Sequence, residues 1–375
     1  MRTLAHILRV GAVVALALFV GTWLADEPPR PPESEPIPLE SAPGPEPPPP
    51  PKPRAPSRLV TIAATGDILM GTDTILPPNA GRGFFADVQA DLAGDVVLGN
   101  LEGTFASGGI PKCQRGSEGC YVFRTPPNYA WRLREAGFTV INLANNHAYD
   151  YGQPGLDETV AAVRAAGLAP TGLLERFALQ RVGDVQVAVV GFAPYVWTNS
   201  LRDLPAVRRL VRRAAAKADV VVVTMHAGAE GVANRHVRPE NESYLGEERG
   251  NVVAFARAAI DAGADLVVGH GPHVLRGMEW YRGRLVAYSL GNFAAYRVFE
   301  LGGALSEGAI LRVTLRADGT FETGTLVATR LVEPGLPVFD PDGAAHQTVR
   351  SLSRADFGAR AVRLSPGGII SGPPA

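Results

Sequence analysis

The feature that most constrains the fold is an alternation of short apolar runs, rich in β-branched residues, with amphipathic stretches. The apolar runs occupy residues 59–64, 96–99, 140–143, 185–191, 220–225 and 266–269. Residues 129–136, 156–166, 205–218 and 251–262 have the apolar spacing of helices, with one buried face each. Strands that alternate with helices predict an α/β architecture in which helices cover the sheets.

The last third of the chain has a different pattern. Apolar runs at 284–289, 309–315 and 320–331 follow one another without a helical stretch of comparable length, which predicts a more antiparallel ending. No internal repeat and no second domain boundary is visible after residue 58. We therefore expect one domain over residues 57–332 and a C-terminal extension, 333–375, that is partly disordered, with a frayed Gly- and Pro-rich end.

The N-terminal segment has the pattern of an export signal. Arg2, His6 and Arg9 precede an uncharged apolar run at 10–25, and a positive flank favours the cytoplasmic side. The run is at the short end for a span of roughly 20 residues. Its C-terminal end has no A-x-A arrangement before a cleavage point, and Trp23 suits a membrane interface. Residues 1–26 are thus predicted to be a single-pass anchor in the cell membrane, with a cleaved signal peptide and a secreted domain as the alternative.

Residues 27–56 are rich in proline, with scattered charged residues. Such a segment cannot form a core and is predicted to be a disordered, extended linker. At about 3.1 Å per residue it could reach up to roughly 90 Å. This length suits a tether that holds the globular domain clear of the membrane.

Composition limits the classes of protein further. Hydrophobic residues make up 46% and charged residues 19% of the chain, and the formal net charge is −1, so a core can form and nucleic acid is not an expected partner. The two cysteines, Cys113 and Cys120, have six residues between them. In an oxidising compartment they would form a disulfide that closes a loop, whereas in the cytosol they would remain free thiols.

Small polar clusters follow nearly every predicted buried strand. Four of the seven histidines lie in these clusters. Because ligand sites in α/β sheets lie outside the carboxyl ends of the strands, the clusters can converge on one crevice. Their carboxylate, carboxamide and imidazole groups suit Zn, Mn, Fe or a similar divalent ion. The side chains concerned are Asp67, Glu102, Asn146, His147, Asp150, His226, Glu230, His270, His273 and Asn292.

The order of these clusters resembles the plan of the calcineurin-like metallophosphoesterases. More narrowly, the motifs GDILMG, GNLEG, NLANNHAYDYG, HAGAE and GHGPHVLRGMEWYRGRLVAYSLGNF resemble the CapA family of poly-γ-glutamate capsule synthesis proteins. The resemblance covers residues 60–293. It implies an α/β fold that forms a four-layer αββα sandwich, and a role in the synthesis or export of a capsule polymer.

The resemblance also implies residue roles. It implies one or two divalent ions, Mn, Zn or Fe, and a single ion becomes plausible because Leu69 stands where phosphoesterases carry a histidine. It implies that His147 interacts with substrate as a general acid or transition-state stabiliser, and Asp150 is its candidate orienting partner. The implied metal ligands are Asp67, Glu102, Asn146, His226, His270 and His273.

Three residues are candidates for binding the substrate, and three kinds of function are compatible with the sequence. Arg124 could bind a carboxylate of an anionic polymer through two hydrogen bonds, with Glu230 and Asn292 beside the site. The chain is expected to be a metal-dependent hydrolase or transferase that acts on an amide or phosphoester of an anionic cell-surface polymer. The alternatives are a non-catalytic accessory subunit that binds poly-γ-glutamate beside membrane synthase subunits, and a general metal-dependent phosphodiesterase.

Overall fold

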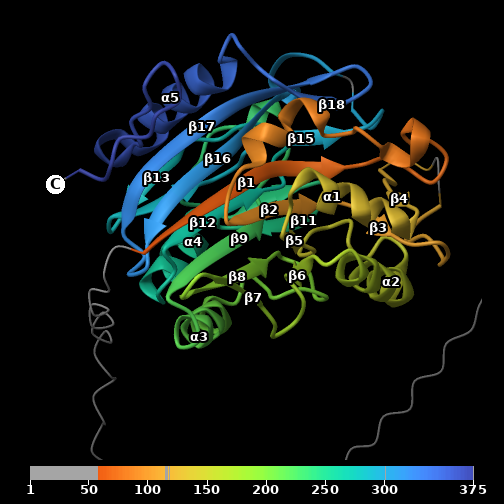
Figure 1. Ribbon diagram of the computed structural model, residues 1–375, viewed down its shortest axis with the longest axis horizontal. Helices are drawn as coiled ribbons and strands as arrows, with labels where there is room; N and C mark the ends of the chain where they lie inside the picture. The colour runs from red at the N-terminus through yellow and green to blue at the C-terminus, as the bar shows by residue number, and fades with distance from the viewer. Residues whose placement is uncertain (1–57, 115–116, 118, 300, 375) are drawn as a thin grey trace, which may run out of the picture. The chain divides into compact units, whose positions relative to one another are not determined.

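The computed structural model describes residues 58–114, 117, 119–299 and 301–374 (Figure 1). The predicted anchor at 1–26 and linker at 27–56 lie outside the described residues. Within the described part, no helix has both the length and the apolar character that a membrane crossing requires.

The larger sheet contains eight strands in the order β18-β17-β16-β1-β2-β5-β6, with β15 also paired to β1. The strands β1, β2, β5, β6 and β15 are parallel to their neighbours in this group, whereas β16, β17 and β18 are antiparallel. The antiparallel ending predicted from the sequence is therefore present. The strand bounds are β1 Leu59–Leu69, β2 Val96–Leu101, β5 Val140–Asn142, β6 Ala169–Thr171, β15 Asn292–Ala295, β16 Glu307–Arg316, β17 Phe321–Val332 and β18 Leu336–Phe339.

The second sheet contains six strands in the order β13-β14-β12-β9-β8-β7. Its four central strands are parallel, and the two edge strands β7 and β13 are antiparallel. The strand bounds are β7 Ala178–Val182, β8 Val185–Phe192, β9 Val220–His226, β12 Leu266–His270, β13 Met278–Tyr281 and β14 Arg284–Ala287.

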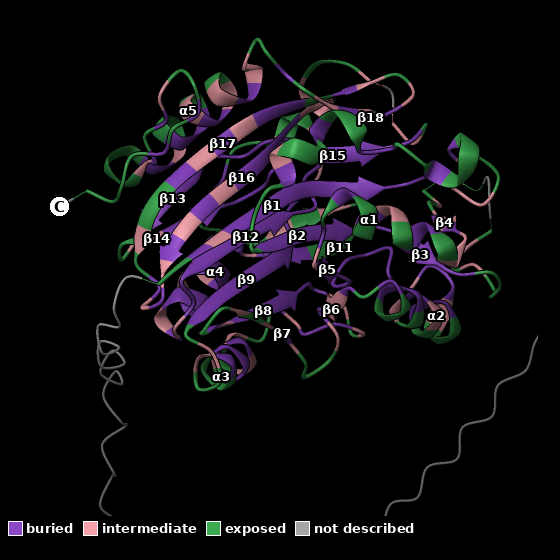
Figure 2. Ribbon diagram, in the orientation of Figure 1, coloured by how far each residue is buried: buried purple, intermediate pink, exposed green. Residues whose placement is uncertain are grey.

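The two sheets pack face to face, and helices cover their outer faces. Side chains of both sheets, such as Val60 and Val222, are fully buried in one central apolar cluster. The helices α1 (Ala130–Ala136) and α2 (Gly152–Ala165) pack on the first sheet, and α3 (Leu204–Ala215) and α4 (Val252–Asp261) pack on the second. Figure 2 shows the buried strands between the helices. The fold is thus the four-layer αββα sandwich that was expected.

Two small sheets lie outside these layers. Strands β3 (Thr104–Phe105) and β4 (Arg124–Thr125) form one, and β10 (Glu242–Tyr244) and β11 (Glu247–Gly250) form the other. The segment between β3 and β4 contains Cys113 and Cys120, which form a disulfide with their Cα atoms 5.9 Å apart.

The C-terminal extension differs from the expectation of partial disorder. It adds strand β18 and helix α5 (Ala344–Phe357), whose Ala345 and Val349 are fully buried in the central core. Ile370 is only 4% exposed, and its backbone N–H donates to Gly324 at 2.9 Å. The apolar side chains of the extension close one end of the sandwich, so the Gly- and Pro-rich composition misled the prediction for the chain end.

A prediction follows from the close approach of β1 and β15. Gly66 precedes the strand-end residue Asp67, and a Cβ atom at position 66 would lie 2.1 Å from the backbone oxygen of Gly291. We expect Gly66→Ala to lower the free energy of unfolding by about 1–3 kcal/mol or more, because backbone must move to make room. Chemical denaturation measures this loss.

The matched control is Gly108→Ala, at a glycine without any neighbour within 4 Å of the added Cβ. Its free energy of unfolding should stay within about 0.5 kcal/mol of the wild-type value. Equal losses in the two variants would contradict the close-approach argument.

Candidate metal centre

The predicted strand-end residues meet because both sheets present the carboxyl ends of parallel strands on the same side. In the first sheet, Asp67 on β1 is in register with Asn100 on β2 and with Asn292 on β15. In the second sheet, the final residues of β9 and β12, His226 and His270, are in register. The strand ends of the first sheet face those of the second sheet across the sandwich.

Glu102, directly after β2, is the point on which the histidines converge. Its Oε1 lies 3.5 Å from Nε2 of His273, 3.6 Å from Nε2 of His226 and 3.9 Å from Nε2 of His147. Glu102 is fully buried, and neither of its carboxyl oxygens has a hydrogen-bond partner among the described residues. Burial raises the pKa of Glu102 well above its ordinary value, against the opposing effect of His273.

Asp67 forms the second anionic group. Its Oδ2 lies 3.4 Å from Nδ1 of His273, and its Oδ1 lies 3.7 Å from Nδ1 of His270 and 3.9 Å from Nδ1 of His226. Burial acts to raise the pKa of Asp67, but the hydrogen bond from His273 and the charges of the three histidines outweigh burial and lower it. Asp67 is therefore ionised at neutral pH.

The histidines differ in how the two carboxyl groups act on them. Burial lowers the pKa of His270 to about 4 and that of His226 well below its ordinary value, although Asp67 opposes both shifts. Burial also acts to lower the pKa of His273, but Glu102 and Asp67 outweigh it and raise that pKa to about 10. His273 lies between the two carboxyl groups with a φ of 58°, a left-handed conformation that costs a non-glycine residue about 1–2 kcal/mol.

The buried polar atoms at this site fit a divalent cation. Neither ring nitrogen of His270 has a hydrogen-bond partner in the described chain, and the same holds for His226 Nε2, Asn146 Oδ1 and both oxygens of Glu102. Donor atoms of Asp67, Glu102 and His273 lie within 4.8 Å of one another. Unpaired buried polar groups are costly, and a carboxylate, imidazole and amide set suits Zn, Mn or Fe. Leu69, which stands where phosphoesterases carry a histidine, is buried and offers no donor atom.

His147 is held at the edge of this cluster by a hydrogen-bonded chain. Its Nδ1 lies 2.8 Å from Oδ2 of Asp150, and Oδ1 of Asp150 lies 2.7 Å from Nζ of Lys112. The ring also packs against Phe123 at 4.4 Å between centroids. Burial lowers the pKa of His147 despite Asp150. In the neutral ring, Nδ1–H donates to the Asp150 carboxylate, and Nε2 faces Glu102.

The three predicted substrate-binding residues occupy different environments. Arg124 donates to the backbone oxygen of Gly108 at 3.0 Å and pairs with Asp73 at 3.3 Å, so its guanidinium already has protein partners. It nevertheless lines a small cavity together with Glu102.

Glu230 and Asn292 both lie against His273. Glu230 Oε1 pairs with Arg249 at 2.9 Å, and its Oε2 lies 3.8 Å from Nε2 of His273. The side chain of Asn292 exchanges hydrogen bonds with the ring and the backbone oxygen of His273 at 3.0 and 3.1 Å. Asn292 is 1% exposed, so in this arrangement it positions His273.

Two further residues of the site were missed in the sequence. Asn100 donates to Asp67 Oδ1 at 2.8 Å, and its own oxygen accepts from Asn142 at 2.8 Å. Its position two residues before Glu102, at the end of the same strand, could have indicated a place at the site. Arg249, 3% exposed on β11, pairs with Glu230. Nothing in its local sequence indicated this, because the β10–β11 hairpin brings it to the site only in the folded chain.

Fold and site together define an αββα sandwich protein with a buried carboxylate–imidazole site of metal-binding type. Residues 61–297 match the family model described as bacterial capsule synthesis protein PGA_cap. The chain therefore belongs to the PGA_cap, or CapA, family of bacterial capsule synthesis proteins.

Individual relatives agree with this family. The chain is 30% identical to "Capsule biosynthesis protein CapA" of Bacillus anthracis over 70% of this chain and 65% of the relative. It is also 30% identical to "PGA biosynthesis protein CapA" of Bacillus subtilis over 70% of this chain and 69% of the relative. The chain thus spans about two thirds of the length of these relatives. A "Probable polyglutamine synthesis accessory protein" of Mycobacterium tuberculosis is 33% identical over 55% of this chain and 57% of the relative.

Two solved structures are similar to this chain. The superposition with a Haemophilus influenzae NAD nucleotidase spans 78% of this chain and 55% of that protein, with 11% identity and a TM-score of 0.39. The superposition with a purple acid phosphatase from yellow lupin spans 76% of this chain and 54% of that protein, with 10% identity and a TM-score of 0.37. At these scores neither protein's chemistry is carried over to this chain.

Asn100 provides the test of the site geometry. Asn100→Ala removes the hydrogen-bond donor to Asp67 Oδ1 and one of the two acceptors of Asn142 Nδ2, which should cost about 1–3 kcal/mol of unfolding free energy. Loss of a group that orients ligands should weaken metal binding by about 10- to 100-fold. Chelator competition measures the affinity. Asn241→Ala, at an exposed asparagine, is the control and should match wild type; wild-type affinity in Asn100→Ala would refute the positioning role.

Proposed function

We propose that this chain acts in the synthesis or export of an anionic surface polymer, such as poly-γ-glutamate, through a metal-dependent hydrolase- or transferase-like site. The observation that carries the proposal is the buried carboxyl group of Glu102, which has no hydrogen-bond partner among the described residues and has three imidazole nitrogens within 3.9 Å. The names of the two Bacillus relatives, which refer to capsule and PGA biosynthesis, support the choice of polymer.

The residues that would hold the ion are Asp67, Glu102, His226, His270 and His273, with Asn146 at the edge. When bound, a divalent ion polarises a carbonyl or phosphoryl oxygen and lowers the pKa of water at the site. This metal chemistry is compatible with cleavage or transfer of an amide or a phosphoester.

The protein's own contribution to the reaction is proton transfer and orientation. His147 presents Nε2 to the site and would donate or accept a proton there. Asp150 and Lys112 hold the opposite ring nitrogen, which fixes the tautomer and the orientation of the imidazole. Glu230, paired to Arg249, forms the side of the site next to His273.

A non-catalytic accessory role is the second candidate, and one observation favours it. Leu69 is a buried apolar side chain where phosphoesterases carry a ligand, so the site offers fewer donors than a complete two-metal centre. The printed name of the M. tuberculosis relative includes the word accessory. In this version the site binds the polymer beside membrane synthase subunits without cleaving it.

The proposed location is outside the cytoplasmic membrane. Residues 1–26 would anchor the chain, and residues 27–56 would tether the globular domain. A disulfide between Cys113 and Cys120 is consistent with an oxidising compartment, since such bonds are rare in the cytosol.

Metal content tests the site. Full-length wild-type protein should purify with a divalent ion or bind one stoichiometrically, whereas Asp67→Ala and His226→Ala should each lose it, because ligands are removed. The control is His236→Ala: His236 pairs with Asp356 away from this cluster, so its loss should leave the metal content unchanged. Elemental analysis of the four proteins measures this, and unchanged content in Asp67→Ala and His226→Ala would refute the site.

Turnover separates the enzyme from the accessory subunit. With poly-γ-glutamate or an aryl phosphodiester as substrate, His147→Gln should lower kcat by about 10²- to 10⁴-fold and keep its metal. Activity on the aryl phosphodiester alone would favour a general phosphodiesterase. Metal-loaded wild type that cuts neither substrate would contradict the catalytic proposal and favour the accessory role.

A further inference from the structure

Helix α3 carries a concentration of positive charge that the metal centre does not use. Residues 204–217 contain four arginines and one lysine and no acidic residue, in a chain whose 36 basic and 37 acidic residues nearly balance. The helix lies on the outer face of the second sheet (Figure 1). The basic residues are Arg208, Arg209, Arg212, Arg213 and Lys217.

The apolar side of α3 is fully occupied by the sheet. Val207, Leu210, Val211 and Ala214 are each at most 3% exposed in the cluster beneath the helix. The remaining surface is therefore cationic, and it is exposed along most of its length (Figure 2). A patch of this kind offers charge to a partner but no apolar side chain of its own.

Few acidic groups neutralise this surface. Arg213 pairs with Glu175 at 2.5 Å, but both side chains are more than half exposed, and such a pair is worth little. Arg208, Arg209 and Lys217 have no acidic partner among the described residues. The charge of Arg208, Arg209 and Lys217 is thus available to an external anion.

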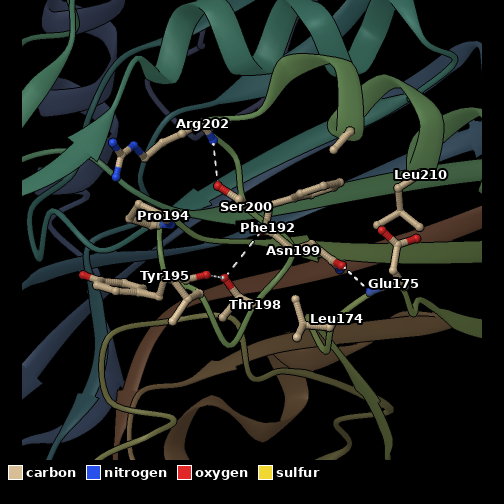
Figure 3. Close-up of a pocket in the computed structure, with 12 residues that line it drawn as sticks. Leu174, Glu175, Phe192, Pro194, Tyr195, Thr198, Asn199, Ser200, Arg202 and Leu210 are labelled. Atoms are coloured by element: carbon tan, nitrogen blue, oxygen red, sulfur yellow. Dashed lines mark hydrogen bonds between the residues drawn. The ribbon is translucent and has the colours of Figure 1, made fainter.

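The basic surface connects to the metal centre through the loop before α3. Trp197 in this loop donates its indole N–H to the backbone oxygen of Asn145 at 3.2 Å, next to Asn146 and His147. The same loop and the first turns of α3 line a cavity of about 340 Å³ (Figure 3). Arg202, two residues before the first residue of α3, lines that cavity with Tyr195. The loop that leads into α3 therefore contacts the residue next to Asn146 and His147.

We propose that the outer face of α3 is a binding site for a linear polycarboxylate that runs between the metal centre and this helix. The inference rests on the proposed function, which it deepens by giving the polymer a second binding site. Arg209 and Arg213 are four residues apart on α3, which is about 6 Å along a helix, and Lys217 follows four residues later in the turn after the helix. A γ-linked glutamate repeat has five backbone atoms, and scaling the extended peptide repeat gives roughly 6 Å between successive carboxylates.

A membrane surface is the competing partner, and the structure favours the polymer over it. Helices that bind in the membrane interface insert apolar side chains in addition to their charges. On α3 these side chains are buried against the sheet, so only electrostatic attraction to lipid would remain. The spacing of the cations along one row matches a chain better than a plane of headgroups.

The test measures binding of full-length protein to poly-γ-glutamate of defined length at several salt concentrations. The triple variant Arg208→Gln, Arg209→Gln, Lys217→Gln should bind at least about tenfold more weakly at low salt, and its slope of log K against log salt should fall by about 2, because three cations no longer release counterions. The control neutralises three exposed arginines on other surfaces: Arg134→Gln, Arg354→Gln, Arg363→Gln. It has the same net charge and should retain wild-type binding, and thermal unfolding should show that both variants are folded.

Three results would overturn the inference: no binding by wild type, equal binding by the two triple variants, or loss in the α3 variant of binding to phosphatidylglycerol vesicles only. Asp67→Ala, measured alongside, separates this inference from the proposed function. We expect it to lose metal and to keep binding to the polymer, since α3 does not depend on the metal ligands. If Asp67→Ala keeps its metal while the α3 variant loses the polymer, the metal site fails and the α3 site stands.

Discussion

The structure depends on the burial of Glu102 among three imidazole rings. A carboxyl group without a hydrogen-bond partner in the interior costs several kcal/mol unless a positive charge is close. Here burial raises the pKa of Glu102, whereas Glu102 and Asp67 outweigh burial at His273 and raise its pKa to about 10. A divalent ion that binds to these side chains would displace protons from them. The arrangement is costly for folding alone, which is the physical reason to assign it to metal binding.

The sandwich makes this cluster possible by supplying rigid strand ends from two sheets. Asp67 lies near the end of β1 and Glu102 follows β2 in one sheet, while His226 and His270 end β9 and β12 of the other. Side chains on packed strands are held more firmly than side chains on loops. Close backbone contacts, such as that between Gly66 and Gly291, bring the strands near enough for the side chains to meet. Asn100 then joins the two halves, because it contacts Asp67 and lies 3.1 Å from His226.

The sequence was most informative where a pattern has a local physical cause. The predicted helices at 205–218 and 251–262 correspond to α3 and α4, whose N-caps Asp203 and Asn251 accept the expected backbone hydrogen bonds. The side chains of the candidate metal site could be found because they lie at or shortly after the ends of apolar strands. Arg249 could not, since its place at the site depends on the β10–β11 hairpin and on Glu230, which lies far from it in the sequence. The C-terminal extension was misjudged because its composition indicates loops, whereas its few apolar side chains complete the core.

The central claim is that Asp67, Glu102 and the histidines form a metal centre, and anomalous diffraction tests it most directly. Crystals of the protein grown with Mn or Zn should show an anomalous peak at the metal edge within about 2.0–2.5 Å of donor atoms from Glu102, Asp67 and His273. A peak at another surface position with none at this cluster, or no peak at all, would contradict the account.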